Sequence, residues 1–228
     1  MAKRHEFYIV HQDKDMIIVD KPPGLLAVPI PNATVKNLQR LVGQFVDKQG
    51  GSIWTVHRID RFTSGLMVFA KKERTYHYLR DLFRSHDVKR SYLAVVRGVP
   101  SPKEGELLHH LKRIKKGFRN IVVSPNDPAG TRAHLWYTVR EELHDASLVE
   151  IELDTGLKNQ IRVQFAEEGH PVIGDQHYVA GEAAEPLINR QALHAWKLSF
   201  PHPSTKQTVT FEAKLPGDIK GLIQSYQK

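Results

Sequence analysis

Apolar segments of strand length recur along the whole chain, and they constrain its fold more than any other feature. They are rich in Val, Ile, Leu, Phe and Tyr, residues that favour strands. Most follow one another directly, without the regular alternation with helices that builds a parallel sheet. The pattern predicts an α+β fold on a large, mostly antiparallel sheet. The predicted strands cover residues 7–10, 16–20, 66–70, 91–98, 133–143, 147–156, 192–200 and 207–215.

Helices are predicted in fewer places. Apolar residues recur at helical spacing over 35–48, 74–86 and 159–169, and a last helix is expected after Gly217. Residues 101–130 combine Lys, Gly, Pro and Asn and predict short strands and loops. Because no internal repeat or convincing linker interrupts the 228 residues, the chain is expected to form a single domain.

Charge and residue usage restrict the function. Lys and Arg number 33 against 25 Asp and Glu, a net charge of +8, which suggests nucleic acid as the partner, although a merely basic protein is equally compatible. The chain has no cysteine, which excludes disulfides and thiolate sites, and none of its 13 histidines falls at a metal-ligand spacing. No apolar run reaches signal-peptide or membrane-spanning length, so a cytoplasmic protein is predicted, and it is expected to be a monomer.

The segment "HRIDRFTSGLMVFAKK", residues 57–72, is the most distinctive one. Asp60 stands between Arg58 and Arg61, and a Thr-Ser-Gly turn leads into an apolar strand. An aspartate in such a setting is commonly a surface ion-pair partner. The buried strand that follows it instead places Asp60 at a sheet edge, where functional residues often lie, and the nearby cations favour its ionised form.

Five ordered motifs resemble those of the RluA-type RNA pseudouridine synthases. The segment around Asp60 is similar to the family's H-R-L/I-D and T-S-G-L pattern, and the others lie before and after it. They are "KPPGLLAVP" (21–29), "KRSYLAVVRG" (89–98), "TGLKNQIRVQFAEEGHPVIGDQHY" (155–178) and "ALHAWKLSFPHP" (192–203). The resemblance implies the pseudouridine synthase fold, a mixed sheet flanked by helices and loops around a basic catalytic cleft. It leaves no room before Lys21 for the S4 domain of many relatives, so one catalytic domain over 1–228 is predicted.

The resemblance implies isomerisation of uridine to pseudouridine in ribosomal or transfer RNA, without a cofactor or metal. Asp60 matches the catalytic aspartate, which either attacks the sugar or deprotonates it to a glycal. Tyr92 matches the active-site tyrosine that packs against the base, and Arg162 matches the arginine that pairs with the aspartate. The matched motifs also supply a predicted substrate-binding set, namely Lys21, His57, Arg58, Arg61, Thr63, Lys71 and Gln160.

Some positions depart from the family pattern. Leu157 and Asn159 replace a usual Arg and His, Gln164 replaces a frequent His, and Phe62 stands where an acid is common. These departures leave a non-catalytic RNA-binding or ribosome-assembly protein as the main alternative. A glycoside hydrolase would need a second carboxylate about 5–10 Å from Asp60. Glu167 and Glu168 are candidates for it, but nothing in the sequence places them there.

Overall fold

The computed structural model describes residues 6–31, 34–114, 119–179 and 187–227. The chain divides into two compact units, each described here by itself. The first unit comprises Met1–Lys89 and Ala195–Lys214, and the second comprises Arg90–His194 and Leu215–Lys228. The prediction that these residues form one catalytic domain stays a prediction.

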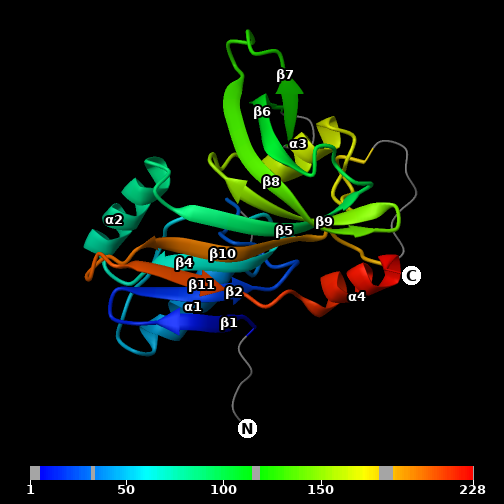
Figure 1. Ribbon diagram of the computed structural model, residues 1–228. Helices are drawn as coiled ribbons and strands as arrows, with labels where there is room; N and C mark the ends of the chain where they lie inside the picture. The colour runs from blue at the N-terminus through cyan, green and yellow to red at the C-terminus, as the bar shows by residue number, and fades with distance from the viewer. Residues whose placement is uncertain (1–5, 32–33, 115–118, 180–186, 228) are drawn as a thin grey trace. The chain divides into compact units, whose positions relative to one another are not determined.

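The first unit is a sheet with two helices (Figure 1). Its strands are hydrogen-bonded in the order β1, β2, β4, β10 and β11, and β3 pairs with β4. Their bounds are β1 (Tyr8–Gln12), β2 (Met16–Lys21), β3 (Trp54–Thr55), β4 (Ser64–Ala70), β10 (Leu193–Pro201) and β11 (Thr208–Glu212). The helices are α1 (Leu38–Asp47) and α2 (Glu73–Arg84).

Strand β4 is the centre of the first unit, because all seven of its residues are buried. Leu66 and Val68 pack with Leu79 of α2 in one apolar cluster. Gly65 has a φ of +116°, and a Cβ there would lie 2.2 Å from the carbonyl oxygen of Ala195 in β10. Only glycine allows this approach between β4 and β10. The strand is therefore a rigid base for the residues that lead into it.

The second unit is an antiparallel sheet in the order β5, β9, β8, β6 and β7. The strands are β5 (Lys89–Arg97), β6 (Glu104–Arg113), β7 (Asn120–Val123), β8 (Thr131–Leu143) and β9 (Ala146–Leu153). Helix α3 (Gln160–Glu167) packs Val163 against Leu111 of β6 and Ala133 of β8, and Phe165 lies edge-on to Tyr137, with ring centroids 5.7 Å apart. Helix α4 (Gly217–Tyr226) ends the described chain.

The α+β class and the predicted strands and helices are confirmed, and their ends differ by a few residues. Helix α1 begins at Leu38 because the side chain of Asn37 accepts a hydrogen bond from the amide of Arg40 at 3.0 Å. The prediction of short strands for 101–130 was wrong in part, since β6 is ten residues long. The two-residue strand β3 was not predicted. In the described parts of the chain, no helix is long and apolar enough to cross a membrane.

Candidate active site

Asp60 begins a tight turn that leads into β4. The amide of Thr63 donates to the carbonyl of Asp60 at 3.2 Å, so Arg61 and Phe62 are the two central residues of a β-turn. The ring of His57 anchors the residues before the turn, because its Nε2 accepts from the amide of Val68 at 3.1 Å. A nitrogen that accepts carries no proton, so His57 is the neutral tautomer with hydrogen on Nδ1. His57 thus attaches the Asp60 segment to β4.

Lys21 holds the same turn from the other side. Its side chain is fully buried, and Nζ donates to the carbonyls of Pro22, Leu25 and Arg61, each at 2.9 Å. Three bonds engage all three protons of an ammonium group. The Arg61 carbonyl also accepts from the amide of Gly24 at 2.9 Å. We therefore assign to Lys21 the positioning of the Asp60 turn.

The other basic residues predicted to bind substrate lie in different places. Arg58 is exposed, and its guanidinium forms no hydrogen bond or ion pair with any residue that the structure describes. Thr63 is buried where β4 starts. Lys71 follows the last residue of β4, a strand of seven residues, so about 23 Å of extended chain separates it from the turn. Its Nζ donates to the carbonyl of Asp13 at 2.6 Å, and the structure does not bring Lys71 together with Asp60.

Tyr92 belongs to the second unit. It lies on β5 opposite Ile151 of β9, and only 9% of it is exposed. Arg90 shares its strand face, and its Nη2 donates to the carbonyl of Asp154 at 2.6 Å. Burial lowers the pKa of Arg90, while the nearby Tyr92 and Asp154 act in the opposite direction. Arg90 was missed from the sequence, although it stands two residues before Tyr92 in the matched motif.

Arg162 is held by a buried carboxylate of the same unit. Its Nε and Nη2 donate to the two oxygens of Asp175 at 2.5 and 2.9 Å, and both side chains are almost fully buried. Its guanidinium carbon lies 5.3 Å from the centre of the Tyr178 ring. Asp175 also accepts from the amide of His177 at 2.8 Å. The G-D-x-x-Y part of the motif thus folds around Asp175 and orients Arg162, a partnership that the spacing alone did not indicate.

Gln160 is engaged with its own chain. Its Oε1 accepts from Thr155 Oγ1 at 2.8 Å and from the Leu157 amide at 3.0 Å, and its Nε2 donates to the His134 carbonyl at 3.0 Å. It is 2% exposed. This geometry favours a role in fixing the start of α3 over direct contact with substrate.

A group with metal-ligand geometry occurs elsewhere in the first unit. Asp13, Asp15 and His202 bring one potential ligand atom each to within 4.8 Å of one another. His202 Nε2 lies 2.8 Å from Asp13, and Lys72 Nζ lies 3.0 Å from Asp15. Burial opposes ionisation of Asp13, but hydrogen bonds from His202 and two backbone amides outweigh it and hold its pKa well below the usual range. These internal bonds join the β1–β2 turn to the end of β10.

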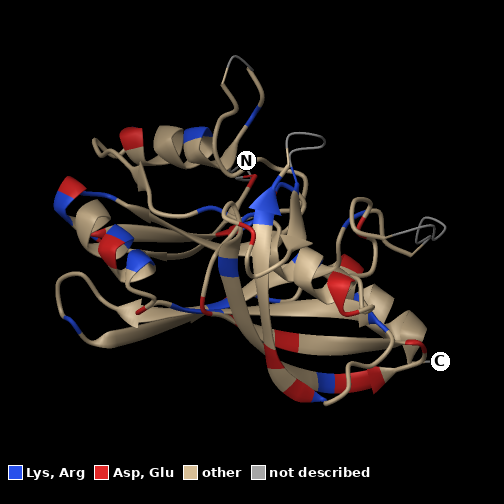
Figure 2. Cartoon of the chain, turned by 90° about the horizontal axis from the view of Figure 1, so that it is seen from above, with Lys and Arg blue, Asp and Glu red and all other residues tan. Residues whose placement is uncertain are grey.

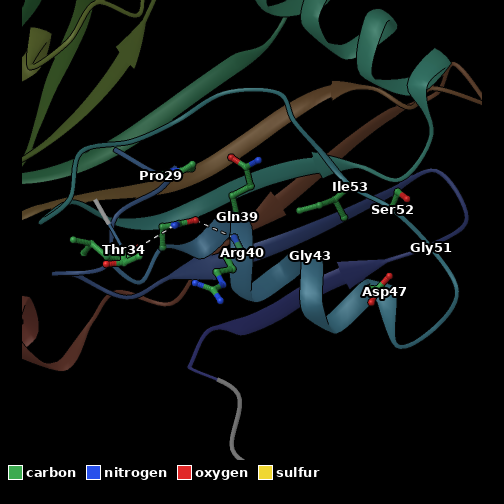
Figure 3. A pocket seen from close by; sticks show the side chains of 11 residues that line it. Pro29, Thr34, Gln39, Arg40, Gly43, Asp47, Gly51, Ser52 and Ile53 are labelled. Carbon is green, nitrogen blue, oxygen red and sulfur yellow. Dashed lines mark hydrogen bonds between the residues drawn. The ribbon is translucent and has the colours of Figure 1, made fainter. Parts of the chain in front are cut away.

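A pocket of about 480 Å³ lies beside α1 (Figure 3). The first helical amides are already engaged, since Leu38 donates to the Leu26 carbonyl at 2.7 Å and Gln39 to the Ala27 carbonyl at 3.1 Å. The helix start therefore offers no ready anion site. Figure 2 shows Lys and Arg interspersed with Asp and Glu over the helices and strands, and the basic cleft stays a prediction.

Comparison with known proteins gives one consistent result. The family model of RNA pseudouridylate synthases matches residues 15–167. The uncharacterized RNA pseudouridine synthases YhcT and YlyB of Bacillus subtilis are 34% and 35% identical to this chain, cover 97% and 100% of it, and are themselves covered over 72% and 75%. The ribosomal large subunit pseudouridine synthase D of Zymomonas mobilis is 33% identical, with 95% of this chain and 71% of the relative covered.

A solved structure shares the fold. Human RNA pseudouridylate synthase domain containing 4 aligns with a TM-score of 0.80 over 96% of this chain and 93% of its own, at 22% identity. The family match covers most of the chain, and Asp60, Tyr92 and Arg162 lie within the matched residues. This chain therefore belongs to the RNA pseudouridine synthase family, in its RluA-type branch, and is an isomerase.

Proposed function

We propose that this chain isomerises specific uridines in ribosomal or transfer RNA, with Asp60, Tyr92 and Arg162 as catalytic residues and without a cofactor. The observation that carries the proposal is the Asp60 turn, to which Lys21 bonds directly and before which His57 fixes the chain. Ribosomal RNA is favoured over transfer RNA because several relatives bear the name of the large ribosomal subunit. The cytoplasm, where such RNA is modified, is the proposed location, and a monomer is the proposed active form.

The reaction changes connectivity without redox chemistry. The C1′–N1 bond breaks, the uracil turns, and a C1′–C5 bond forms; C5 loses one proton and N1 gains one. The Asp60 carboxylate either attacks C1′ or takes a proton from the sugar to give a glycal. Both routes need an ionised, well-positioned oxygen, and both place Asp60 against the ribose. The His57 and Lys21 contacts reduce the freedom of the turn and so favour this positioning.

Tyr92 and Arg162 supply complementary functions. A uridine within structured RNA must leave its stack, at a cost of a few kcal/mol. Stacking on an aromatic face contributes about 1–3 kcal/mol per base, which offsets part of that cost. The Tyr92 hydroxyl is assigned the removal of the C5 proton, and the Arg162 guanidinium, which Asp175 orients, is assigned the pairing with the Asp60 carboxylate.

The RNA is positioned through its phosphates by exposed basic residues near the turn. Arg58 and Arg61 are assigned this role, and Thr63 is assigned to the start of β4 beneath it. Such contacts fix orientation and do not read sequence. Lys21, His57 and Gln160 act indirectly, because their polar atoms bind the protein's own backbone.

Substitution of Asp60 by Asn tests the assignment. The amide can neither attack the sugar nor accept its proton, while its shape is nearly unchanged. RNA incubated with the wild type should gain pseudouridine at defined positions, RNA incubated with Asp60→Asn should gain none, and both proteins should bind RNA alike. Turnover of the variant within about tenfold of wild type, less than 1.4 kcal/mol, would exclude Asp60. Binding without new pseudouridine in either protein would establish the non-catalytic alternative, and mapping RNA from a deletion strain identifies the uridine.

A further inference from the structure

Arg61 and Phe62 form an exposed pair beside Asp60. They are the central residues of the turn closed by the 3.2 Å bond from the Thr63 amide to the Asp60 carbonyl. Phe62 is 42% exposed, and Arg61 is also exposed. The guanidinium carbon of Arg61 lies 5.1 Å from the centre of that ring. A flat cation and a flat ring thus lie together at the surface of the turn.

The loop before α1 holds the guanidinium in this position. Arg61 Nε donates to the carbonyl of Gly24 at 2.9 Å, and the Gly24 amide donates back to the Arg61 carbonyl at 2.9 Å. Gly24 has a φ of +83°, which L side chains rarely adopt. The loop conformation that offers this carbonyl therefore depends on glycine. An arginine side chain that is already ordered loses less conformational entropy when another planar group stacks on its guanidinium.

Phenylalanine is an unusual residue for this position. The central positions of β-turns favour Gly, Pro, Asn, Asp and Ser, and Phe62 buries only part of its ring. Single exposed apolar residues are common on proteins, so exposure alone indicates nothing. What distinguishes Phe62 is the fixed guanidinium over its ring and its position two residues after Asp60.

We propose that the Arg61–Phe62 pair is a stacking platform for an unpaired base of the RNA, that of a nucleotide flanking the uridine bound at Asp60. The proposal rests on the proposed function and specifies its substrate class as a uridine with an unstacked neighbour in a loop or single strand. The Cα atoms of Asp60 and Phe62 are at most about 7.6 Å apart, because consecutive Cα atoms are about 3.8 Å apart. At that separation, Asp60 and Phe62 can contact two adjacent nucleotides of one strand. Single-stranded RNA is recognised by stacking on aromatic and Arg planes.

Binding to two uridine-free strands tests the platform independently of catalysis. One is a short labelled oligoadenylate, and the other is an abasic strand of the same length and backbone. Phe62→Leu keeps an apolar side chain but removes the ring, and should weaken oligoadenylate binding by about fivefold or more. It should leave abasic-strand binding unchanged, and the salt dependence should stay that of wild type because no phosphate contact is lost. Arg61→Lys keeps the charge but not the plane, so it should also weaken oligoadenylate more than the abasic strand.

Two further variants control the result. Phe62→Tyr retains the ring and should bind as wild type, which excludes a folding defect at this position. Tyr8→Leu removes an aromatic side chain that is 72% exposed on β1 and should change neither affinity. The platform would be overturned if Phe62→Leu lost affinity equally for both strands or lost none for oligoadenylate. It would also be overturned if Tyr8→Leu lost as much affinity for oligoadenylate as Phe62→Leu. None of these outcomes depends on pseudouridine formation, so the two proposals fail separately.

Discussion

Lys21→Met is the most informative perturbation of the Asp60 turn. Methionine keeps most of the buried stem but removes the ammonium that binds three carbonyls at 2.9 Å. The Arg61 carbonyl keeps the Gly24 amide as a donor, whereas the Pro22 and Leu25 carbonyls lose the bond from Nζ. The substitution therefore removes the Lys21 link between the turn and the 21–25 loop and leaves the two Gly24–Arg61 bonds in place, without changing any exposed charge.

The expected loss of stability follows from these two carbonyls. A buried acceptor that loses its donor costs about 1–3 kcal/mol. Both residues are half-buried, so water replaces part of each bond, and the lower end, about 2 kcal/mol in total, is expected. For a chain of this length, about 2 kcal/mol lowers the melting temperature by roughly 4–8 °C. A displacement of the Asp60 carboxylate by about 1 Å slows the chemical step by up to a hundredfold.

The assay is single-turnover pseudouridine formation on the mapped substrate, together with thermal unfolding and the salt slope of RNA binding. The matched control is Lys72→Met. Lys72 lies beyond the far end of β4 and its Nζ is 3.0 Å from the buried Asp15, so that variant should lose stability without losing rate. The reasoning is refuted if Lys72→Met slows turnover as much as Lys21→Met. It is also refuted if Lys21→Met keeps its rate and stability while the salt slope falls by about one phosphate contact.

Substitutions at three further positions test other parts of the molecule. Tyr92→Phe should bind RNA as wild type but turn over more slowly, and Tyr92→Ala should also bind more weakly; equal rates for Phe and wild type would remove the hydroxyl from proton transfer. Asp175→Asn leaves the Arg162 charge without its carboxylate and should destabilise the fold by about 3–5 kcal/mol, measured by denaturant unfolding. Burial raises the pKa of Asp20 to about 6, against the lowering effects of a hydrogen bond from the Gly65 amide and of the nearby Lys21 charge. The native state therefore loses stability as the pH rises from about 4 through 6, and Asp20→Asn should unfold at a less pH-dependent temperature.

The sequence predicted the helices and strands well where the apolar pattern was strong. It predicted individual side-chain contacts poorly. Strand β4 was evident because residues 66–70 are uniformly apolar, and the whole strand is buried. The positioning roles were not evident, because a motif shows that a lysine or glutamine is required but not which atoms it binds. Substrate binding by Lys21 and Gln160 stays a prediction, and the structure adds that their polar atoms bind carbonyls, an amide and a hydroxyl of the chain itself. Such bonds join residues far apart in the sequence, so spacing carries no sign of them.

The departures from the family pattern around α3 fall at positions that pack or turn the chain. Leu157 packs against the small cluster of Leu111, Ala133 and Val163.

Asn159 has a φ of +57° just before the helix, a conformation that asparagine tolerates better than most residues. Gln164 is fully buried, and its Nε2 donates to the carbonyls of Leu107 and Ala133 at 3.0 and 3.2 Å. Arg162, in the same helix, keeps its two-point geometry with Asp175. These three departures therefore concern the packing of α3 against β6 and β8, whereas Asp175 orients Arg162. Gln164→His, which introduces the residue frequent in the family, should accordingly change the stability of the fold more than the rate of turnover. If it changes the rate of turnover more than the stability, Gln164 takes part in the reaction itself.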